Sequence, residues 1–183
     1  MNVQEQYVAF MTIVRKEIKR YLRIWTQTLL PSAITMSLYF VIFGTLIGSR
    51  IGEMGGFTYM EFVVPGLIMM AIVTNSYSNV VSSFFGAKFS GSVEELLVSP
   101  VSNVVILMGY VVGGVSRGLL VAVVVTLVSL FFTDLTIHSY FIVVVVVLMT
   151  STLFALAGFI NAVYANSFDD ISIIPTFVLT PLI

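Results

Sequence analysis

The chain has 183 residues, of which 58% are hydrophobic and 9% charged, with a net charge of −1 and a mean hydropathy of +1.08. A soluble domain is about 25% charged, so this chain has too few charges to cover a water-facing surface, and most of its surface must face lipid. The charge balance excludes the basic surface of a nucleic-acid-binding protein. With no cysteine and a single histidine, His138, thiolate and multi-histidine metal sites are excluded as well.

Residues 1–23 form the first expected element, an amphipathic helix. At 100° per residue, one face is apolar and the opposite face basic. The apolar face carries Val3, Tyr7, Phe10, Val14, Ile18 and Tyr21, and the basic face carries Arg15, Lys16, Lys19, Arg20 and Arg23. This pattern is typical of a helix in the membrane interface with its cations toward anionic head groups. It is compatible with a plain anchor and with a partner-docking element.

Stretches without charge predict the membrane spans, because a crossing helix needs about 20 mostly apolar residues. Four spans are expected: 26–48, 59–81, 103–132, and one within the gap between His138 and Asp169. The 13 residues after Asp170 are almost all apolar, but they would reach only about 20 Å, so they predict the start of a fifth helix. The expected fold is an all-α integral membrane protein with an N-terminal interfacial helix, four complete transmembrane helices and part of a fifth.

The orientation in the membrane follows from the positions of Lys and Arg. Five of the eight precede the first span. If these lie in the cytoplasm, the loops 82–102 and 164–170 are cytoplasmic too. The count is then six basic residues inside, Arg50 outside and Arg117 buried. The chain is therefore expected to have a cytoplasmic N-terminus.

The cytoplasmic loop 82–102 contains the sequence SGSVEELLVSPVS, residues 90–102. Ser92 and Glu95 have the spacing of a capping box, which predicts a short helix beginning there. Val93, Leu96 and Leu97 would form its apolar face, Glu94 lies beside them, and Pro100 would end it. Such a helix suits docking to a cytoplasmic partner, or it caps the protein's own spans; the spacing does not decide between them.

Arg117 is the one charge inside the third predicted span, 103–132. A charge at this depth costs a few kcal/mol on insertion scales, so it should face protein or water and have a partner. Asn75 and Asn79, four residues apart in the second span, are the candidate partners within the chain, and an acid on another subunit is the alternative. The arginine is either a polar tie between helices or a contact for a transported molecule. Two small-xxx-small pairs beside it, Gly109/Gly113 and Gly114/Gly118, predict close helix packing.

Asp169 and Asp170 lie in the second cytoplasmic loop, in SFDDIS. Paired acids suggest metal or acid–base chemistry, but no histidine or further carboxylate lies nearby. A cap at the start of the next helix is the simpler interpretation, and the same position would let the two acids touch a cytoplasmic partner.

Several of these segments together resemble the membrane subunits of the type 2 ATP-binding-cassette exporters, in particular a bacterial subgroup of multidrug, lipo-oligosaccharide and polysaccharide exporters. They are the basic N-terminal helix, FVVPGLIMM (62–70), FFGAKFSGSVEELLVSP (84–100), GYVVGGVSRG (109–118) and SFDDIS (167–172). The most specific is EELLVSP, since family members carry an acid, two leucines and a proline at this spacing in their cytoplasmic coupling helix.

The resemblance implies a single permease domain over residues 1–183, incomplete at its C-terminal end, in the bacterial cytoplasmic membrane. It implies six spans in the whole protein, pairing with a second copy, and a separate ABC ATPase subunit below. No cofactor would bind to this chain, because ATP and Mg²⁺ belong to that partner. Residues 93–98 would be the coupling helix, with Asp169 and Asp170 near a second contact. The cargo would be an amphipathic drug, a lipid-linked molecule or a saccharide.

Two other functions are weighed against export by a permease. An ion-coupled secondary transporter would need acids in mid-membrane, and every acid is expected in a loop or at a span end. An intramembrane enzyme would need a cluster of catalytic groups, which one histidine in an outer loop does not supply. No phosphate-binding GxxxxGK[ST] occurs, so the chain itself is not expected to be an ATPase. Without a catalytic cluster it is not expected to be another enzyme.

Overall fold

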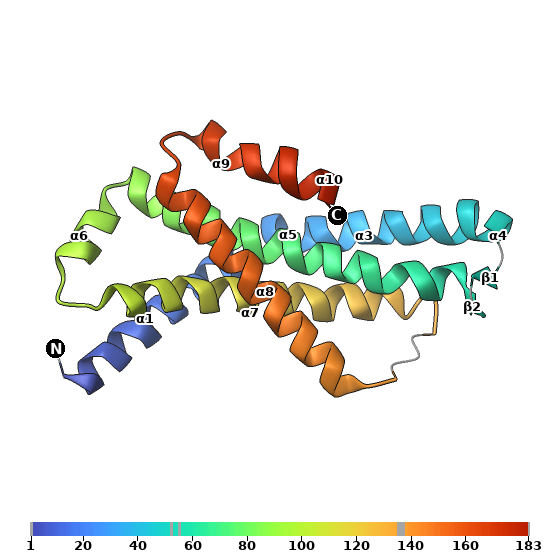
Figure 1. Cartoon of the computed structure of the whole chain (residues 1–183), viewed down its shortest axis with the longest axis horizontal. Helices are drawn as coiled ribbons and strands as arrows, with labels where there is room; N and C mark the ends of the chain where they lie inside the picture. The colour runs from blue at the N-terminus through green and yellow to red at the C-terminus, as the bar shows by residue number, and fades with distance from the viewer. Residues whose placement is uncertain (1, 52, 55, 135–137, 183) are drawn as a thin grey trace.

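The computed structural model is an elongated bundle of long helices (Figure 1). It describes residues 2–51, 53–54, 56–134 and 138–182. The helical elements are α1 (Val3–Arg23), α2 (Trp25–Thr28), α3 (Leu30–Val41), the π-helix η1 (Ile42–Ile47), α4 (Gly48–Ile51), α5 (Tyr59–Phe89), α6 (Ser92–Val98), α7 (Asn103–Ser129), α8 (Tyr140–Tyr164), α9 (Phe168–Ile174), the π-helix η2 (Pro175–Leu179) and α10 (Thr180–Leu182). A small antiparallel hairpin of β1 (Glu53–Met54) and β2 (Phe57–Thr58) joins α4 to α5.

Four helical stretches are long and apolar enough to cross a membrane: Trp25–Gly44, Tyr59–Phe89, Asn103–Ser129 and Tyr140–Tyr164. They overlap the four stretches expected from the sequence, so the all-α membrane fold is confirmed. The second differs in length, since α5 has 31 residues and continues to Phe89. At about 1.5 Å per residue it exceeds the roughly 30 Å hydrocarbon core. Its last turns therefore extend beyond the core, toward α6.

The apolar C-terminal segment is helical, as expected. α9, η2 and α10 follow one another without a break, and the segment runs beside α5 above the rest of the bundle in Figure 1. It begins at a capping box formed by Ser167 and Asp170, which supplies the start signal that the sequence indicated.

The glycines of α7 determine how closely its neighbours approach. A Cβ at Gly109 would lie 2.6 Å from Cγ2 of Ile13, and one at Gly113 would lie 2.6 Å from Cβ of Glu17. On another side of the same helix, a Cβ at Gly114 or Gly118 would overlap the side chains of Val80 and Ser76 of α5. The two small-xxx-small pairs therefore receive different helices, α1 and α5. Such contacts replace the hydrophobic effect, which does not drive association between helices in lipid.

α1 departs from the sequence prediction. Val3 and Tyr7, at the start of the expected apolar face, are 82% and 62% exposed, as side chains that face lipid would be. The face that is buried in the protein is formed by Ile13, Val14, Glu17 and Tyr21. The predicted basic face was wrong at Arg20, which hydrogen-bonds to α5. The physical reason is that α1 packs on α7 through Gly109 and Gly113, and this contact, not the helix's own amphipathicity, selects its inward face.

Two apolar clusters fill the bundle. One lies on the α6 side and includes Tyr77, Phe84 and Tyr110, with the rings of Phe84 and Tyr110 5.2 Å apart. The other lies nearer the hairpin and includes Phe40 and Val125. α8 crosses α5 and α7 obliquely (Figure 1) and approaches α5 closely at Gly158, where a Cβ would lie 2.6 Å from the carbonyl oxygen of Tyr77.

Candidate functional site

The centre of the bundle contains a polar cluster built on one face of α5. Arg117 of α7 donates to Oδ1 of Asn75 at 3.0 Å and to the carbonyl oxygen of Thr28 at 3.3 Å. The Nδ2 group of Asn75 donates to Oγ of Ser32 at 3.0 Å and to the carbonyl oxygen of Ala71 at 2.9 Å. The expectation that Arg117 faces protein and contacts Asn75 is confirmed. The bonds join the first three spans.

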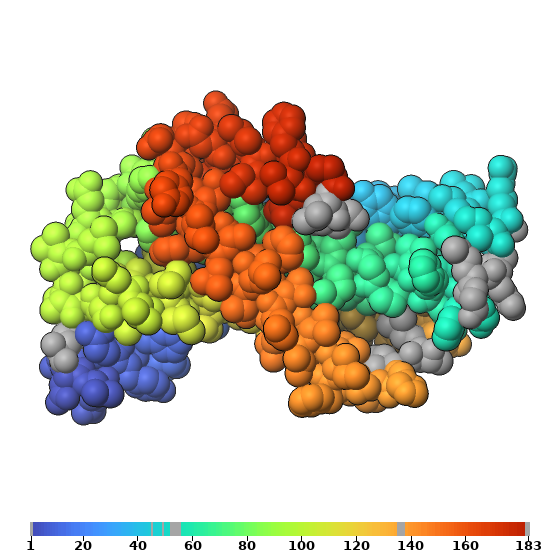
Figure 2. Space-filling view, in the orientation of Figure 1, coloured from blue at the N-terminus to red at the C-terminus, as the bar shows by residue number. Residues whose placement is uncertain are grey.

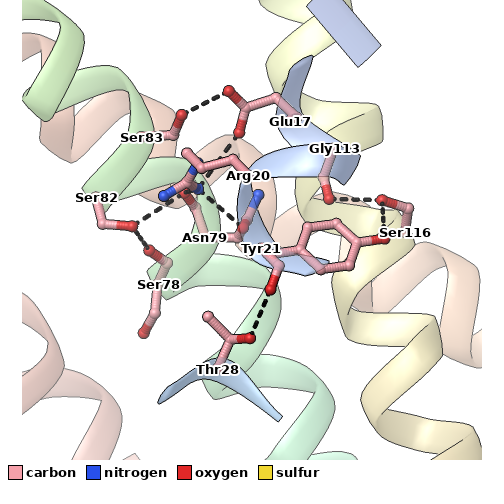
Figure 3. Close-up of polar contacts among 10 residues, drawn as sticks. All are labelled: Glu17, Arg20, Tyr21, Thr28, Ser78, Asn79, Ser82, Ser83, Gly113 and Ser116. Atoms are coloured by element: carbon pink, nitrogen blue, oxygen red, sulfur yellow. Dashed lines mark hydrogen bonds and ion pairs between the residues drawn. The ribbon is translucent and has the colours of Figure 1, made fainter. Parts of the chain in front are cut away.

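The second half of the cluster surrounds Asn79 and includes Glu17 and Ser83, which the sequence analysis did not single out. Arg20 donates to Oδ1 of Asn79 at 3.0 Å and to the carbonyl oxygen of the same residue at 2.9 Å, and it forms an ion pair with Glu17 at 3.4 Å (Figure 3). Oγ of Ser83 donates to the other carboxylate oxygen of Glu17 at 2.6 Å. The pairing of Asn79 with Arg117 was therefore wrong. Asn79 lies one turn nearer α6, opposite Arg20.

Glu17 is fully buried, with no exposed surface. This corrects the expectation that every acid lies in a loop or at a span end. The burial was readable in principle, because Ile13, Glu17 and Tyr21 are spaced by four residues and share one face of a helix. That signal was masked by the five cations of the same segment, which suggested a water- and head-group-facing helix.

The junction between α1 and the first span is also held by hydrogen bonds. Oγ1 of Thr28 donates to the carbonyl oxygen of Tyr21 at 2.9 Å, and the hydroxyl of Tyr21 donates to Oγ of Ser116 at 3.3 Å (Figure 3). Ser116 in turn donates to the carbonyl oxygen of Gly113 at 2.8 Å. The C-terminal part of α1 is thus tied to both neighbouring spans.

α6 begins differently from the prediction. The capping box of Ser92 with Glu95 was wrong: Gly91 is the N-cap, with φ +77°, and no side chain caps the helix. Oγ of Ser92 instead donates to the carbonyl oxygen of Ala87 at 3.1 Å. The reason is that α5 runs on to Phe89, which leaves a two-residue turn. A turn this tight needs a left-handed residue, which favours glycine.

The other residues of α6 and of the loop after it form two groups, one packed against the protein and one exposed. Val93 is buried and Leu96 packs against the apolar cluster on the α6 side, so these two hold the helix to the protein. Glu94, Glu95, Leu97 and Pro100 are exposed. The side chain of Gln6 in α1 donates to the carbonyl oxygen of Pro100 at 3.3 Å and accepts from the backbone N–H of Ser102 at 3.1 Å. α1 therefore supports the loop that follows α6.

The two acids at the start of α9, Asp169 and Asp170, differ in their surroundings. Asp170 accepts from the backbone N–H groups of Asn166 at 2.9 Å and Ser167 at 3.0 Å, as expected for a helix cap. Hydrogen bonds, first from the backbone of Asn166 and then from Ser167, hold the pKa of Asp170 below its usual value. Asp169 is exposed. Nearby, Nζ of Lys88 donates to the last carbonyl oxygens of α8, at Val163 (2.8 Å) and Ala165 (2.7 Å), and so ties α5 to the end of α8.

A groove of about 1230 Å³ lies between α5, α7 and α8, away from α6. Its walls are apolar, including Phe62, Met69 and Val123, and acids stand at its edge, Glu61 and Asp134. An apolar surface in the membrane is ordinarily covered by lipid chains. The groove therefore does not by itself indicate a substrate site.

Comparisons with known proteins place this geometry in a family. The family model described as ABC-2 type transporter matches residues 8–183. The chain is 60% identical over 176 residues to the protein named inner membrane transport permease YadH of Escherichia coli K12, with 96% of this chain and 69% of the relative covered. Proteins of the same name from E. coli O157:H7 and Shigella flexneri match equally. No solved structure matches. The match over nearly the whole chain shows that it belongs to the ABC-2 type transporter family, as a multi-pass permease of the inner membrane.

Proposed function

We propose that this chain is the membrane-embedded subunit of an ATP-driven exporter, which moves an amphipathic drug, a lipid-linked molecule or a saccharide out of the cytoplasm. The ABC-2 family implies an ABC ATPase partner, and that partner would bind ATP and Mg²⁺. A second copy of the permease would complete the transport path.

The observation that carries the proposal is the exposed apolar edge of α6. Leu97 and Val98 are 58% and 87% exposed, although they lie outside the four crossing helices, where lipid would cover them. Glu94 and Glu95 stand beside them. α6 forms one extreme end of the molecule (Figure 2). A short helix with apolar anchors and acidic neighbours fits a groove with basic edges on the ATPase.

The contacts that hold α6 to the rest of the protein suit it to transmit a movement of the ATPase to the spans. Val93 and Leu96 pack on the cluster formed by the inner parts of α5 and α7, and Gln6 ties the following loop to α1. A displacement of α6 by the ATPase would therefore reach all three helices. Asp169, exposed at the start of α9 next to Asp170, is proposed as a second contact with the same subunit.

The N-terminus is proposed to be cytoplasmic, with α6 on the same side. The support is the excess of basic residues in α1 and near α6. The chain has no cysteine, so Ser92→Cys and His138→Cys introduce single labels at opposite ends. An impermeant reagent added to spheroplasts should label the cysteine at position 138 only. Labelling of the cysteine at position 92 would contradict the proposed topology.

Asn75, Asn79 and Arg117 are proposed to lie along the substrate path. Their position at mid-bundle, where polar groups are expensive, supports a role beyond anchoring. Glu17 is an observation in favour of the rival ion-coupled transporter. Its carboxylate, however, is already occupied by the ion pair with Arg20 and the hydrogen bond from Ser83.

The docking role of α6 is tested by recovery of the ATPase with the intact permease. The double change Leu97→Ser and Val98→Ser removes the exposed anchors and leaves Val93 and Leu96 in place. Burial of such a side chain contributes about 1.5–3 kcal/mol, so recovery of the ATPase should fall at least tenfold while membrane insertion is unchanged.

Phe131→Ser is the matched control, because Phe131 is as exposed as Val98 at 87% but lies beyond the far end of α7. It should leave recovery of the ATPase unchanged. Undiminished recovery with the double variant would show that α6 serves only to cap the permease's own spans.

A further inference from the structure

The polar cluster at the centre of the bundle has more hydrogen-bond donors than acceptors. Over the described residues, four buried side-chain atoms have no hydrogen-bond partner: Nε of Arg20, Nδ2 of Asn79, Nε of Arg117 and Oγ of Ser76. All four belong to this cluster or to the α5 turn that it contacts, and three are N–H donors. Each unpaired buried donor costs about 1–3 kcal/mol. The fold concentrates this cost in one place, as expected where an acceptor from another molecule binds.

The cluster also carries excess positive charge. It holds two guanidinium groups, Arg20 and Arg117, and one carboxylate, Glu17, which lies 3.4 Å from Arg20 and also accepts from Ser83. In the described part of the chain, no ion pair joins Arg117 to a carboxylate. Charge interactions are strong in a medium of low dielectric constant, so an uncompensated guanidinium there favours an anion nearby.

Arg20 gives the cluster an opening to the membrane surface. Its side chain is 29% exposed, whereas Glu17 beneath it is fully buried. Lys16 and Arg23 lie four residues before and three residues after it, so they share its side of α1, and both are exposed. Trp25, 53% exposed, follows at the start of the first span. A row of cations beside an apolar ring matches the boundary between an anionic head group and its chain.

We propose that Arg20, Asn79 and Arg117 form a binding site for the phosphate-type head group of an anionic amphiphile, with Arg20 as the residue that first contacts it. A guanidinium binds phosphate oxygens through paired N–H donors. The donors are covered in the present conformation, and rotation of the Arg20 side chain away from Asn79 exposes them. The inference that this amphiphile is the cargo rests on the proposed export function, but the inference that it binds here does not.

The test measures retention of radiolabelled dodecyl phosphate by the intact permease in phosphatidylcholine nanodiscs, after subtraction of empty discs. Dodecyltrimethylammonium has the same chain with the opposite charge, and inorganic phosphate supplies the head group alone. Dodecyl phosphate should bind saturably and more tightly than either. Equal binding of the cationic probe would overturn the proposal.

Variants locate the site. Arg20→Gln and Arg117→Gln should each weaken dodecyl phosphate binding about tenfold, the effect of one charge-assisted hydrogen bond. Lys19→Gln, one residue from Arg20 but exposed and outside the cluster, is the matched control and should change binding less than about twofold. Arg117→Lys keeps the charge without the planar donors and separates lost binding from lost folding. If the arginine variants bind as the Lys19 variant does, the cluster is not the site.

A second measurement distinguishes a transported amphiphile from a resident lipid. In the permease–ATPase complex, cargo should raise ATP hydrolysis, and the Arg20→Gln variant should lose this response. Binding without stimulation assigns the site to a resident anionic lipid. If the ATPase does not associate with the permease at all, the proposed export function fails while the binding result still stands.

Discussion

The two halves of the bundle are held together in different ways. In the half that includes α6 and the bundle centre, the long-range bonds are polar and specific, such as Arg117–Asn75, Arg20–Asn79 and the 2.6 Å bond from Asn161 to the hydroxyl of Tyr77. In the half near the hairpin, Phe40, Val125 and their neighbours form apolar contacts beside an open groove.

The difference shows where a membrane protein obtains its specificity. Lipid is as apolar as a leucine side chain, so apolar contacts alone do not select one arrangement of helices. Close contacts at glycine and buried hydrogen bonds do select one arrangement. A shifted helix would lose the hydrogen bonds and would clash at the glycine contacts. The half near α6 is thereby fixed as one unit.

The largest effect is expected from blocking the close contact of α7 with α5. Gly114→Leu would drive a side chain into Val80 and the carbonyl oxygen of Ser76. Overpacking of this kind should lower the free energy of unfolding by about 3 kcal/mol, measured by SDS titration in mixed micelles with circular dichroism. The matched control is Gly66→Leu, because a Cβ at Gly66 meets no atom within 4 Å. Equal losses in the two variants would contradict the difference between the halves.

A smaller effect is expected from Arg117→Leu. Insertion should be normal, since removal of a charge from the middle of a span relieves an insertion cost. The folded bundle should lose about 1 kcal/mol, because Asn75 keeps its bond from Ser32. Membrane-fraction yield and SDS titration measure the two quantities. If stability, subunit assembly and transport all stay unchanged, Arg117 is neither a tie nor a substrate contact.

The smallest effect is expected in the groove. Val123 is 57% exposed and lines its wall, so Val123→Ala should change the free energy of unfolding by less than about 0.5 kcal/mol. The same SDS titration checks it. A loss as large as that of Arg117→Leu would mean that the half near the hairpin is as tightly constrained as the half near α6.

Much of the fold could be predicted from the sequence, because insertion depends on local properties. Stretches of about 20 apolar residues cross the bilayer whatever their neighbours are. The contact of Arg117 with Asn75 was also predictable, since a charge in a span needs a partner and few polar residues lie at its depth. A cap at the start of α9 was also predicted from its two acids, because capping depends only on residues close in sequence; the structure adds that Ser167 is the partner of Asp170.

The errors concern features that depend on distant contacts. Glu17 and Arg20 lie in a segment whose composition indicates a surface helix, and only the docking of α1 on Gly109 and Gly113 turns them inward. Asn79 was assigned to the wrong arginine for the same reason. The start of α6 was misplaced because α5 continues past its apolar stretch, supported by packing against α8 and by the bond from Lys88 to the last turn of that helix.

The sequence by itself determined the membrane class, the four spans, the family and the need for a partner at Arg117, since these follow from hydrophobicity, length, charge and local motifs. Only the tertiary structure decided which side of α1 is buried, which asparagine each arginine contacts, and that the unpaired donors gather in one cluster. Those outcomes depend on which helices approach closely enough for side chains to meet, and glycines far apart in the chain control that approach.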